Sequence, residues 1–199
     1  MPIQNVKNFE LNNASFSTPK KLSNGKYFIS IDVSNEPLMF QLTKIKAQFT
    51  DNSSELFLTP ELGEFVKDME EQVVTIAKKH KETWFPGKEI DDTFFDTAIM
   101  PALKVVKKQG TLKAQINESC MAFNSAKEEI ERTEISSDSN ISTIINISGI
   151  WFTKTRFGLS WKVAQIKLHG LPKPPKGQCL FDDDDEDDHM DEFPEGVPE

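Results

Sequence analysis

Apolar and polar residues alternate along several short stretches of this 199-residue chain, and a period of two predicts β-strands. In the stretch 38–49, for example, Lys44 and Lys46 fall on one face, while Ile45 and Ala47 fall on the other. Clusters of Asn, Ser, Asp and Pro separate these stretches and predict turns. Before the last third of the chain, strands are expected over residues 26–33, 38–49, 55–58, 111–116 and 120–123.

One stretch has the helical period instead. Over residues 59–80 the apolar residues recur at steps of three and four, which predicts an amphipathic helix whose stripe lies in the core. Thr59 is a suitable N-cap, and Pro60 occupies the first helical position, where a missing N–H costs nothing. A shorter helix interrupted by Pro101 is expected within residues 91–106. Residues 125–140 form a polar excursion that is mobile or loosely helical.

The chain then continues into two strand-like runs, residues 141–153 and 157–168, which predict a β-hairpin. Lys154, Thr155 and Arg156 form its tip, with Gly158 available for a turn conformation that a side chain would resist. Phe157, Leu159, Trp161 and Val163 point to one face of the second strand, and alternate residues point to the other. In the first strand, Trp151 and Phe152 point to opposite faces.

The hairpin interleaves aromatic rings with cations, which is the chemistry that a single-stranded nucleic acid requires. Bases stack on flat rings, and phosphates pair with Lys and Arg. Trp151, Phe152, Phe157 or Trp161 would stack. Each ring can instead belong to the core, and each lysine can simply lie on a solvated face. The candidate nucleic-acid-binding residues are Lys44, Lys46, Trp151, Lys154, Arg156, Phe157, Trp161, Lys162 and Lys167.

Charge divides the chain into two parts. The net charge is −9, but residues 182–199 contain eleven acidic residues and neither Lys nor Arg. The preceding part has 23 basic and 21 acidic residues and is therefore slightly basic. We expect one domain over residues 1–170 and, over 171–199, a stiff Pro-rich linker followed by a disordered acidic tail. The candidate partner-binding residues in this tail are Asp182, Asp183, Asp184, Asp185, Glu186, Asp187, Asp188 and Phe193.

Composition and motifs argue against several other classes of protein. An apolar run near ~18 residues is absent, so no membrane span is expected, and the N-terminus does not resemble a secretory signal. The two cysteines suit a reducing compartment. The glycines form no phosphate-binding loop, and the three histidines lack partners at ligand or triad spacing. We therefore expect neither an enzyme nor a metal or cofactor site. Lys104, Lys107 and Lys108 form a further basic patch.

The segment 149–168, GIWFTKTRFGLSWKVAQIKL, resembles the C-terminal signature of the single-stranded-DNA-binding proteins of large eukaryotic DNA viruses. The stretch from Asp182 to Phe193 resembles the acidic tails of viral and phage single-stranded-DNA-binding proteins, although six residues follow Phe193 here. Three strands, one helix and further strands match the order of an OB-fold. The predicted fold is mainly β (α+β): an OB-fold-like Greek-key barrel with one main helix, helical insertions and an acidic tail.

This resemblance implies sequence-tolerant binding of single-stranded DNA in viral replication, recombination or repair. It also implies a partner such as a DNA polymerase, recruited through the tail, and a location in the host nucleus or at a cytoplasmic viral replication site. The residues themselves do not distinguish DNA from RNA. They also leave open a second hypothesis, a protein-interaction module or chaperone of basic proteins that acts through the acidic tail.

Overall fold

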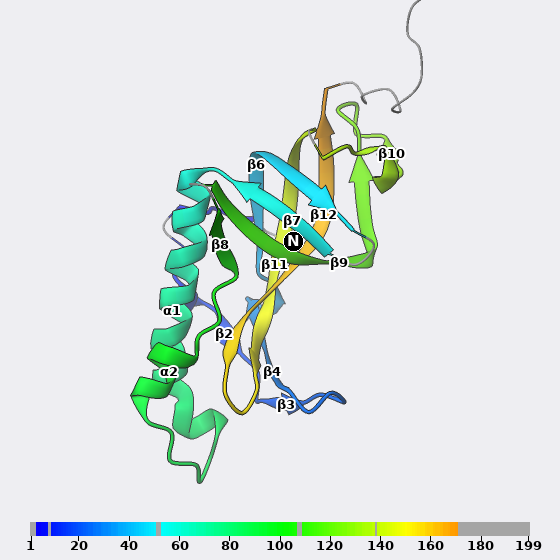
Figure 1. The fold of residues 1–199 in the computed structure, drawn as a ribbon. Helices are drawn as coiled ribbons and strands as arrows, with labels where there is room; N and C mark the ends of the chain where they lie inside the picture. Colours follow the sequence, from blue (N-terminus) through cyan, green and yellow to red (C-terminus); the bar gives the residue numbers. More distant parts are fainter. Residues whose placement is uncertain (1–2, 8, 51–52, 107–108, 138, 171–199) are drawn as a thin grey trace, which may run out of the picture.

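The computed structural model describes residues 3–7, 9–50, 53–106, 109–137 and 139–170 (Figure 1). In chain order the elements are β1 Ile3–Gln4, η1 Leu11–Asn13, β2 Ser15–Phe16, β3 Lys20–Lys21, β4 Tyr27–Val33, β5 Glu36–Pro37, β6 Met39–Phe49, β7 Ser53–Leu58, α1 Pro60–Trp84, α2 Asp92–Ala98, β8 Leu103–Val106, β9 Gln109–Phe123, β10 Glu129–Ile130, η2 Arg132–Glu134, β11 Asn140–Phe152 and β12 Phe157–His169. The acidic tail and its linker lie outside the described residues.

Five strands close into a barrel. Their order is β6–β7–β9–β12–β11, and β11 pairs again with β6. The β9–β12 pair is parallel, whereas the other pairs around the barrel are antiparallel. Strand β4 pairs with the other end of β11 and extends the sheet along the hairpin. This is the closure of an OB-fold, and it confirms the predicted mainly β barrel with one main helix.

A bulge in β6 allows the barrel to close. Ile45 pairs with Ile141 and Leu42 with Thr143, so the register shifts between these two pairs. Lys44 lies there with a positive φ of 56°, which is uncommon for a residue with a side chain. Beyond the bulge, β6 leaves β11 and pairs with β7 instead. The strand therefore bends from one side of the barrel to the other, as bulged strands do.

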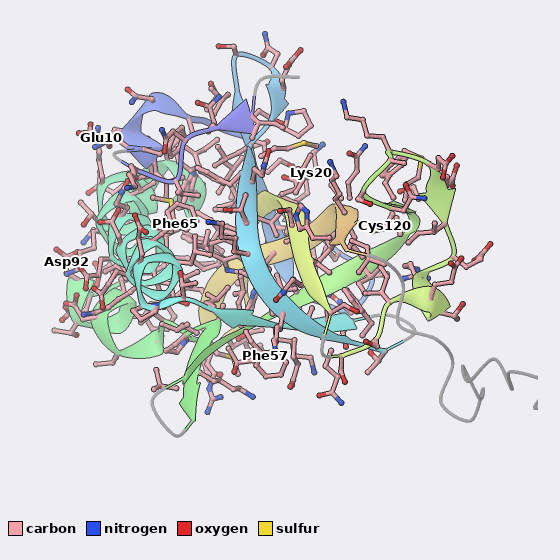
Figure 2. All side chains as sticks on the ribbon, turned by 90° about the horizontal axis from the view of Figure 1, so that it is seen from above. Glu10, Lys20, Phe57, Phe65, Asp92 and Cys120 are labelled. Carbon is pink, nitrogen blue, oxygen red and sulfur yellow. The ribbon has the colours of Figure 1, made fainter. Side chains whose placement is uncertain are left out.

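Helix α1 covers the barrel interior with its apolar stripe. The Thr59 hydroxyl accepts a hydrogen bond from the Leu62 N–H, as expected of the N-cap, and the helix continues past the predicted end at residue 80 to Trp84. The Phe65 ring meets the inward-facing rings of Phe40 and Trp161 at centroid distances of 4.8 and 6.3 Å. Figures 1 and 2 show α1 and α2 together on one side of the barrel.

Four local predictions differ from the structure. The two strands expected over 111–116 and 120–123 are one continuous strand, β9. The helix expected within 91–106 ends at Ala98, before Pro101, and the residues after it form strand β8. The excursion at 125–140 contains the short strand β10, which pairs with β9, and among its described residues only a single 3-10 turn is helical. Gly158 does not form the hairpin turn but lies within β12. The turn is held instead by the Thr153 hydroxyl, which accepts a hydrogen bond from the Arg156 N–H at 3.0 Å.

Candidate nucleic-acid interface

A groove of about 610 Å³ crosses the outer face of the sheet beside the hairpin. Its walls come from the segment before β4, the α2–β8 connection and strands β4, β7, β8, β9, β11 and β12. We call it the Trp151 groove and define it by its rings and cations: Lys26, Phe28, Lys104, Lys113, Trp151, Trp161 and Lys162. Leu22 and Met100 also line it, with 40% and 43% of their surfaces exposed. Exposed apolar side chains gathered in one groove are typical of a binding surface.

Two glycines bring the aromatic rings of the groove close to the sheet. Trp151 pairs across the hairpin with Gly158, and a Cβ at Gly158 would lie 3.0 Å from an indole carbon of Trp151. Trp151 is also in register with Phe28 on β4. The Phe28 ring covers Gly149, where a Cβ would lie 2.6 Å from a ring carbon. Both rings are half-buried, so they stay partly open to solvent while the sheet backbone supports them.

The groove is electropositive. Four lysines line it, and no carboxylate occurs among the described lining residues. Within the described part of the chain none of these lysines forms an ion pair, whereas Lys78 and Lys81 on α1 bind carboxylates at 2.6 and 2.7 Å. The Lys26 ammonium lies 5.4 Å from the centre of the Trp151 ring, a cation–π distance.

Two carboxylates near the groove have identifiable roles. Glu55 is the cross-strand neighbour of Lys113 and moderates the positive charge at that end. Glu70 reaches from α1 to the segment that leads into β8, where its carboxylate accepts a hydrogen bond from the Ala102 N–H at 2.5 Å. Burial raises the pKa of Glu70, and the backbone hydrogen bonds of Ala102 and Leu103 partly oppose that rise. Glu70 thereby fixes the strand that carries Lys104 into the groove.

The predicted aromatic residues divide between surface and core. Trp151 lies in the groove, and Phe152, on the opposite face, is buried, as the alternation predicted. Phe157 has no exposed surface and stacks on Phe152 at 5.2 Å and 8°. Trp161 borders the groove, but it is only 3% exposed and packs against Phe65. Phe157 and Trp161 are therefore core rings, the alternative that the sequence left open. Neither presents a ring face to a base in this structure.

The predicted cations do not form a single cluster. Lys162 lines the groove, but Lys167 lines a different pocket, described below. Lys154 and Arg156 are exposed at the hairpin tip. Lys44 and Lys46 are exposed on β6 and line neither site. The predicted partner-binding residues Asp182–Asp188 and Phe193 fall outside the described residues, so their role stays a prediction.

Lys26, Phe28 and Lys113 were not predicted as parts of a site. The alternation along β4 already placed Phe28 opposite to Ile29, and Gly149 and Gly158 interrupt strands rich in bulky residues. A glycine within a strand is a known sign that a side chain or ligand approaches the backbone closely. Only the register between β4 and β11 shows that Phe28 lies over Gly149. The residues of these two strands are more than a hundred positions apart, so local sequence patterns do not reveal that register.

Other kinds of site find no support in the described part of the chain. Its His, Cys, Asp and Glu side chains form no group of three or more that could hold a metal ion. None of its helices is both long and apolar enough to cross a membrane. The thiol of Cys120 is buried, and this burial raises its pKa, which makes it a poor nucleophile.

The strand order and the groove define the chain as an OB-fold protein with an aromatic and basic surface. The chain belongs to a family described as "Family of unknown function (DUF5871)", which matches residues 43–183. The search of curated proteins found no match.

Solved structures with a similar arrangement include proteins of bacteriophages. The single-stranded DNA-binding protein from bacteriophage Enc34 is 15% identical, with a TM-score of 0.48, and the match covers 83% of this chain and 96% of that one. The Enc34 protein in complex with ssDNA is 14% identical, with a TM-score of 0.46 and coverages of 79% and 97%. The single-stranded DNA binding protein gp2.5 of bacteriophage T7 is 13% identical, with a TM-score of 0.48 and coverages of 81% and 100%. Likeness at this level assigns no function to this chain.

Proposed function

We propose that the protein binds single-stranded DNA in the Trp151 groove with little regard to base sequence. The observation that carries this proposal is a half-buried ring, Trp151, surrounded by four lysines in a groove whose described lining contains no carboxylate. A base stacks on the open face of the indole, while the ammonium groups of Lys26, Lys104, Lys113 and Lys162 pair with the phosphates on either side. The sequence resemblance of residues 149–168 to viral single-stranded-DNA-binding proteins supports the same conclusion.

Sequence tolerance follows from the type of contact. Every base has a π face, so stacking does not distinguish one base from another, and ammonium–phosphate pairs involve only the backbone. A closed duplex keeps its bases stacked inside, so it offers phosphates to the lysines but no free base to Trp151. The protein should therefore prefer single strands to duplex. Parallel titrations with oligo-dT, oligo-rU and duplex DNA determine which strand is preferred.

The salt dependence of binding tests the proposal. Each lysine–phosphate contact on a single strand contributes about −0.7 to the log–log slope of affinity against salt, so four contacts give about −2.8, or a loss of about 50-fold between 50 and 200 mM salt. Replacing Lys104 or Lys162 by Gln should reduce the slope by about 0.7 each. Lys67→Gln, on an exposed position of α1, is the matched control and should leave it unchanged. A slope near zero in the wild-type protein would eliminate the proposal.

We further propose, from the sequence resemblance, a non-enzymatic role in viral DNA replication, recombination or repair. On this proposal the acidic segment 182–199 recruits a basic surface of a replication protein such as a DNA polymerase, in the host nucleus or at a cytoplasmic viral replication site. Its eleven acidic residues carry the opposite charge to such a surface. Polymerase should bind the full chain more tightly than the chain truncated after Gln178, and equal binding of both forms argues against recruitment through this segment.

A further inference from the structure

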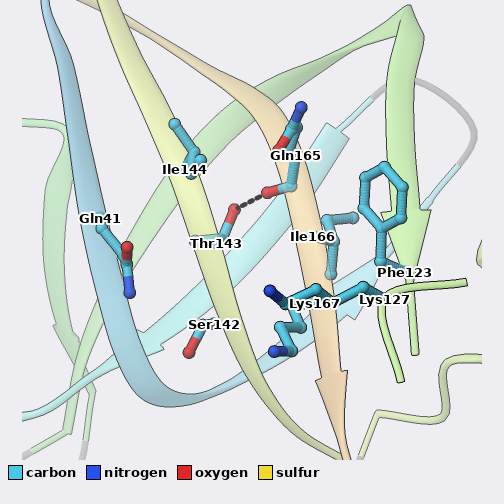
Figure 3. A pocket seen from close by; sticks show the side chains of 9 residues that line it. All are labelled: Gln41, Phe123, Lys127, Ser142, Thr143, Ile144, Gln165, Ile166 and Lys167. Carbon is cyan, nitrogen blue, oxygen red and sulfur yellow. Dashed lines mark hydrogen bonds between the residues drawn. The ribbon is translucent and has the colours of Figure 1, made fainter. Parts of the chain in front are cut away.

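A second cationic pocket lies farther along the same hairpin (Figure 3). Its volume is about 310 Å³, and it lies between β6 and the end of β9, over the outer face of β11 and β12. We call it the Lys127–Lys167 pocket. It combines one ring, Phe123, with two cations and with the amide side chains of Gln41 and Gln165. Figure 3 shows Phe123 on the β9 side, Gln41 on the β6 side and the two lysine side chains between them.

The backbone around Lys127 is held in an uncommon conformation. Lys127 has a positive φ of 69°, in a region that residues with a Cβ rarely adopt. The turn is fixed by Asn124, whose side-chain oxygen accepts a hydrogen bond from the Glu128 N–H at 3.0 Å and whose amide group donates to the Glu128 carboxylate at 2.7 Å. Glu128, the adjacent acid, is thus engaged by Asn124. Lys127 and Lys167 form no ion pair within the described part of the chain.

The pocket and the Trp151 groove share one row of side chains on β12. Lys162 lines the groove, and Gln165 and Lys167 line the pocket. Lys167 lies five positions after Lys162, which corresponds to about 16 Å along a strand. On β11 the facing residues are Asn146, opposite Lys162, and Ile144, opposite Gln165. The outer face of this hairpin therefore joins the two sites without an intervening strand.

We propose that the Lys127–Lys167 pocket is a second subsite for the strand that occupies the Trp151 groove. A base packs against Phe123 and Ile144, and a flanking phosphate pairs with the two ammonium groups. The described lining contains no carboxylate to oppose that phosphate. This inference rests on the proposed function of the groove. It implies that a long strand contacts both sites, whereas a short strand in the groove does not reach the pocket.

The test compares two oligomer lengths: about 2 nucleotides, too short to span the roughly 16 Å between Lys162 and Lys167, and about 16 nucleotides, at the upper end of the site sizes of OB-folds. The double variant Lys127→Gln/Lys167→Gln should bind the short oligomer in the groove like the wild type, with Trp151 fluorescence as the readout. For the long oligomer, the log–log salt slope of the double variant should be shallower by about 1.4, because two lysine–phosphate contacts are lost. Between 50 and 200 mM salt, the affinity of the wild type should therefore fall by a factor about 7 times larger than that of the variant. The control Lys67→Gln/Lys79→Gln loses the same charge from exposed positions of α1.

The outcomes separate the two proposals. If the wild-type protein binds neither oligomer, the function proposed for the groove fails. If it binds both, but the double variant changes both slopes equally or changes neither, the groove stands and the second subsite is overturned. Tighter binding of the long oligomer by the double variant also overturns it, because the pocket then holds a competing anion such as the chain's own acidic segment.

Discussion

Replacement of Phe157 by alanine distinguishes a core ring from a stacking platform. Its side chain has no exposed surface and contacts three other rings, Phe94, Phe95 and Phe152, at centroid distances of 6.3, 5.7 and 5.2 Å. Removal of a fully buried phenyl ring costs about 3–5 kcal/mol of folding free energy, from lost burial and the cavity that remains. Phe157→Ala should therefore lower the free energy of unfolding in urea by this amount, and molecules that remain folded should bind oligo-dT nearly normally.

Trp151→Ala should have the opposite profile. Its ring is half-buried and rests on Gly158, so its removal should cost on the order of 1 kcal/mol of stability. The loss of one stacked base should weaken oligo-dT binding by about 1–3 kcal/mol, or about 5- to 150-fold. Trp151→Phe keeps a ring in place and should recover part of that loss. If Phe157→Ala keeps wild-type stability but loses binding, Phe157 is the stacking ring and not a core ring. If Trp151→Ala unfolds the protein without affecting the affinity of the folded fraction, Trp151 does not stack on a base.

Three further predictions concern packing, protonation and the tail. Gly149→Ala should destabilise the fold by about 1–3 kcal/mol in urea melts, because the new methyl group would meet the Phe28 ring and the backbone beside it. The pKa of the Glu70 carboxyl is raised above its ordinary value near 4.5, so the folded state holds its proton to a higher pH than the unfolded state does. The stability of the wild-type protein relative to Glu70→Gln should therefore fall as the pH rises from 4.5 through the raised pKa. Melting temperatures of the two proteins that change in parallel over this pH range would contradict this. Truncation after Gln178 removes eleven acidic residues. If they compete with DNA for the groove lysines, the truncation should tighten oligo-dT binding at low salt, whereas equal affinities show that they do not compete.

Local patterns in the sequence predicted much of the fold. The apolar stripe and cap of α1 involve residues close in sequence, and the hairpin of β11 and β12 is also a local unit. The bulge at Lys44 was not predicted, because its cause is the closure of β6 onto both β11 and β7. Gly158 was predicted to form the hairpin turn, and this was wrong. It lies within β12 and makes room for the Trp151 ring.

The candidate site was harder to predict, for a physical reason. Alternation shows which residues share a face of a strand but not which face the rest of the chain covers. Phe157 and Trp161 share a face, and α1 and α2 cover that face, so their rings became core. Trp151 lies on the uncovered face. The lysines that join it come from segments far apart in the chain, and the pairings of β9 with β12 and of β11 with β4 bring Lys113 and Lys26 to the same groove.

Tryptophan fluorescence during titration with oligo-dT reports directly on base stacking at Trp151. Of the three tryptophans, Trp84 is 5% exposed and lies outside the groove, and Trp161 lines the groove but is only 3% exposed. Trp151 is half-buried there, so a stacked base should alter mainly the emission of Trp151. We predict saturable quenching by oligo-dT that weakens with salt, is much smaller with duplex DNA, and is largely lost in Trp151→Phe while binding followed by anisotropy persists. Undiminished quenching in Trp151→Phe, or equal quenching by duplex, would contradict a single strand stacked in the Trp151 groove.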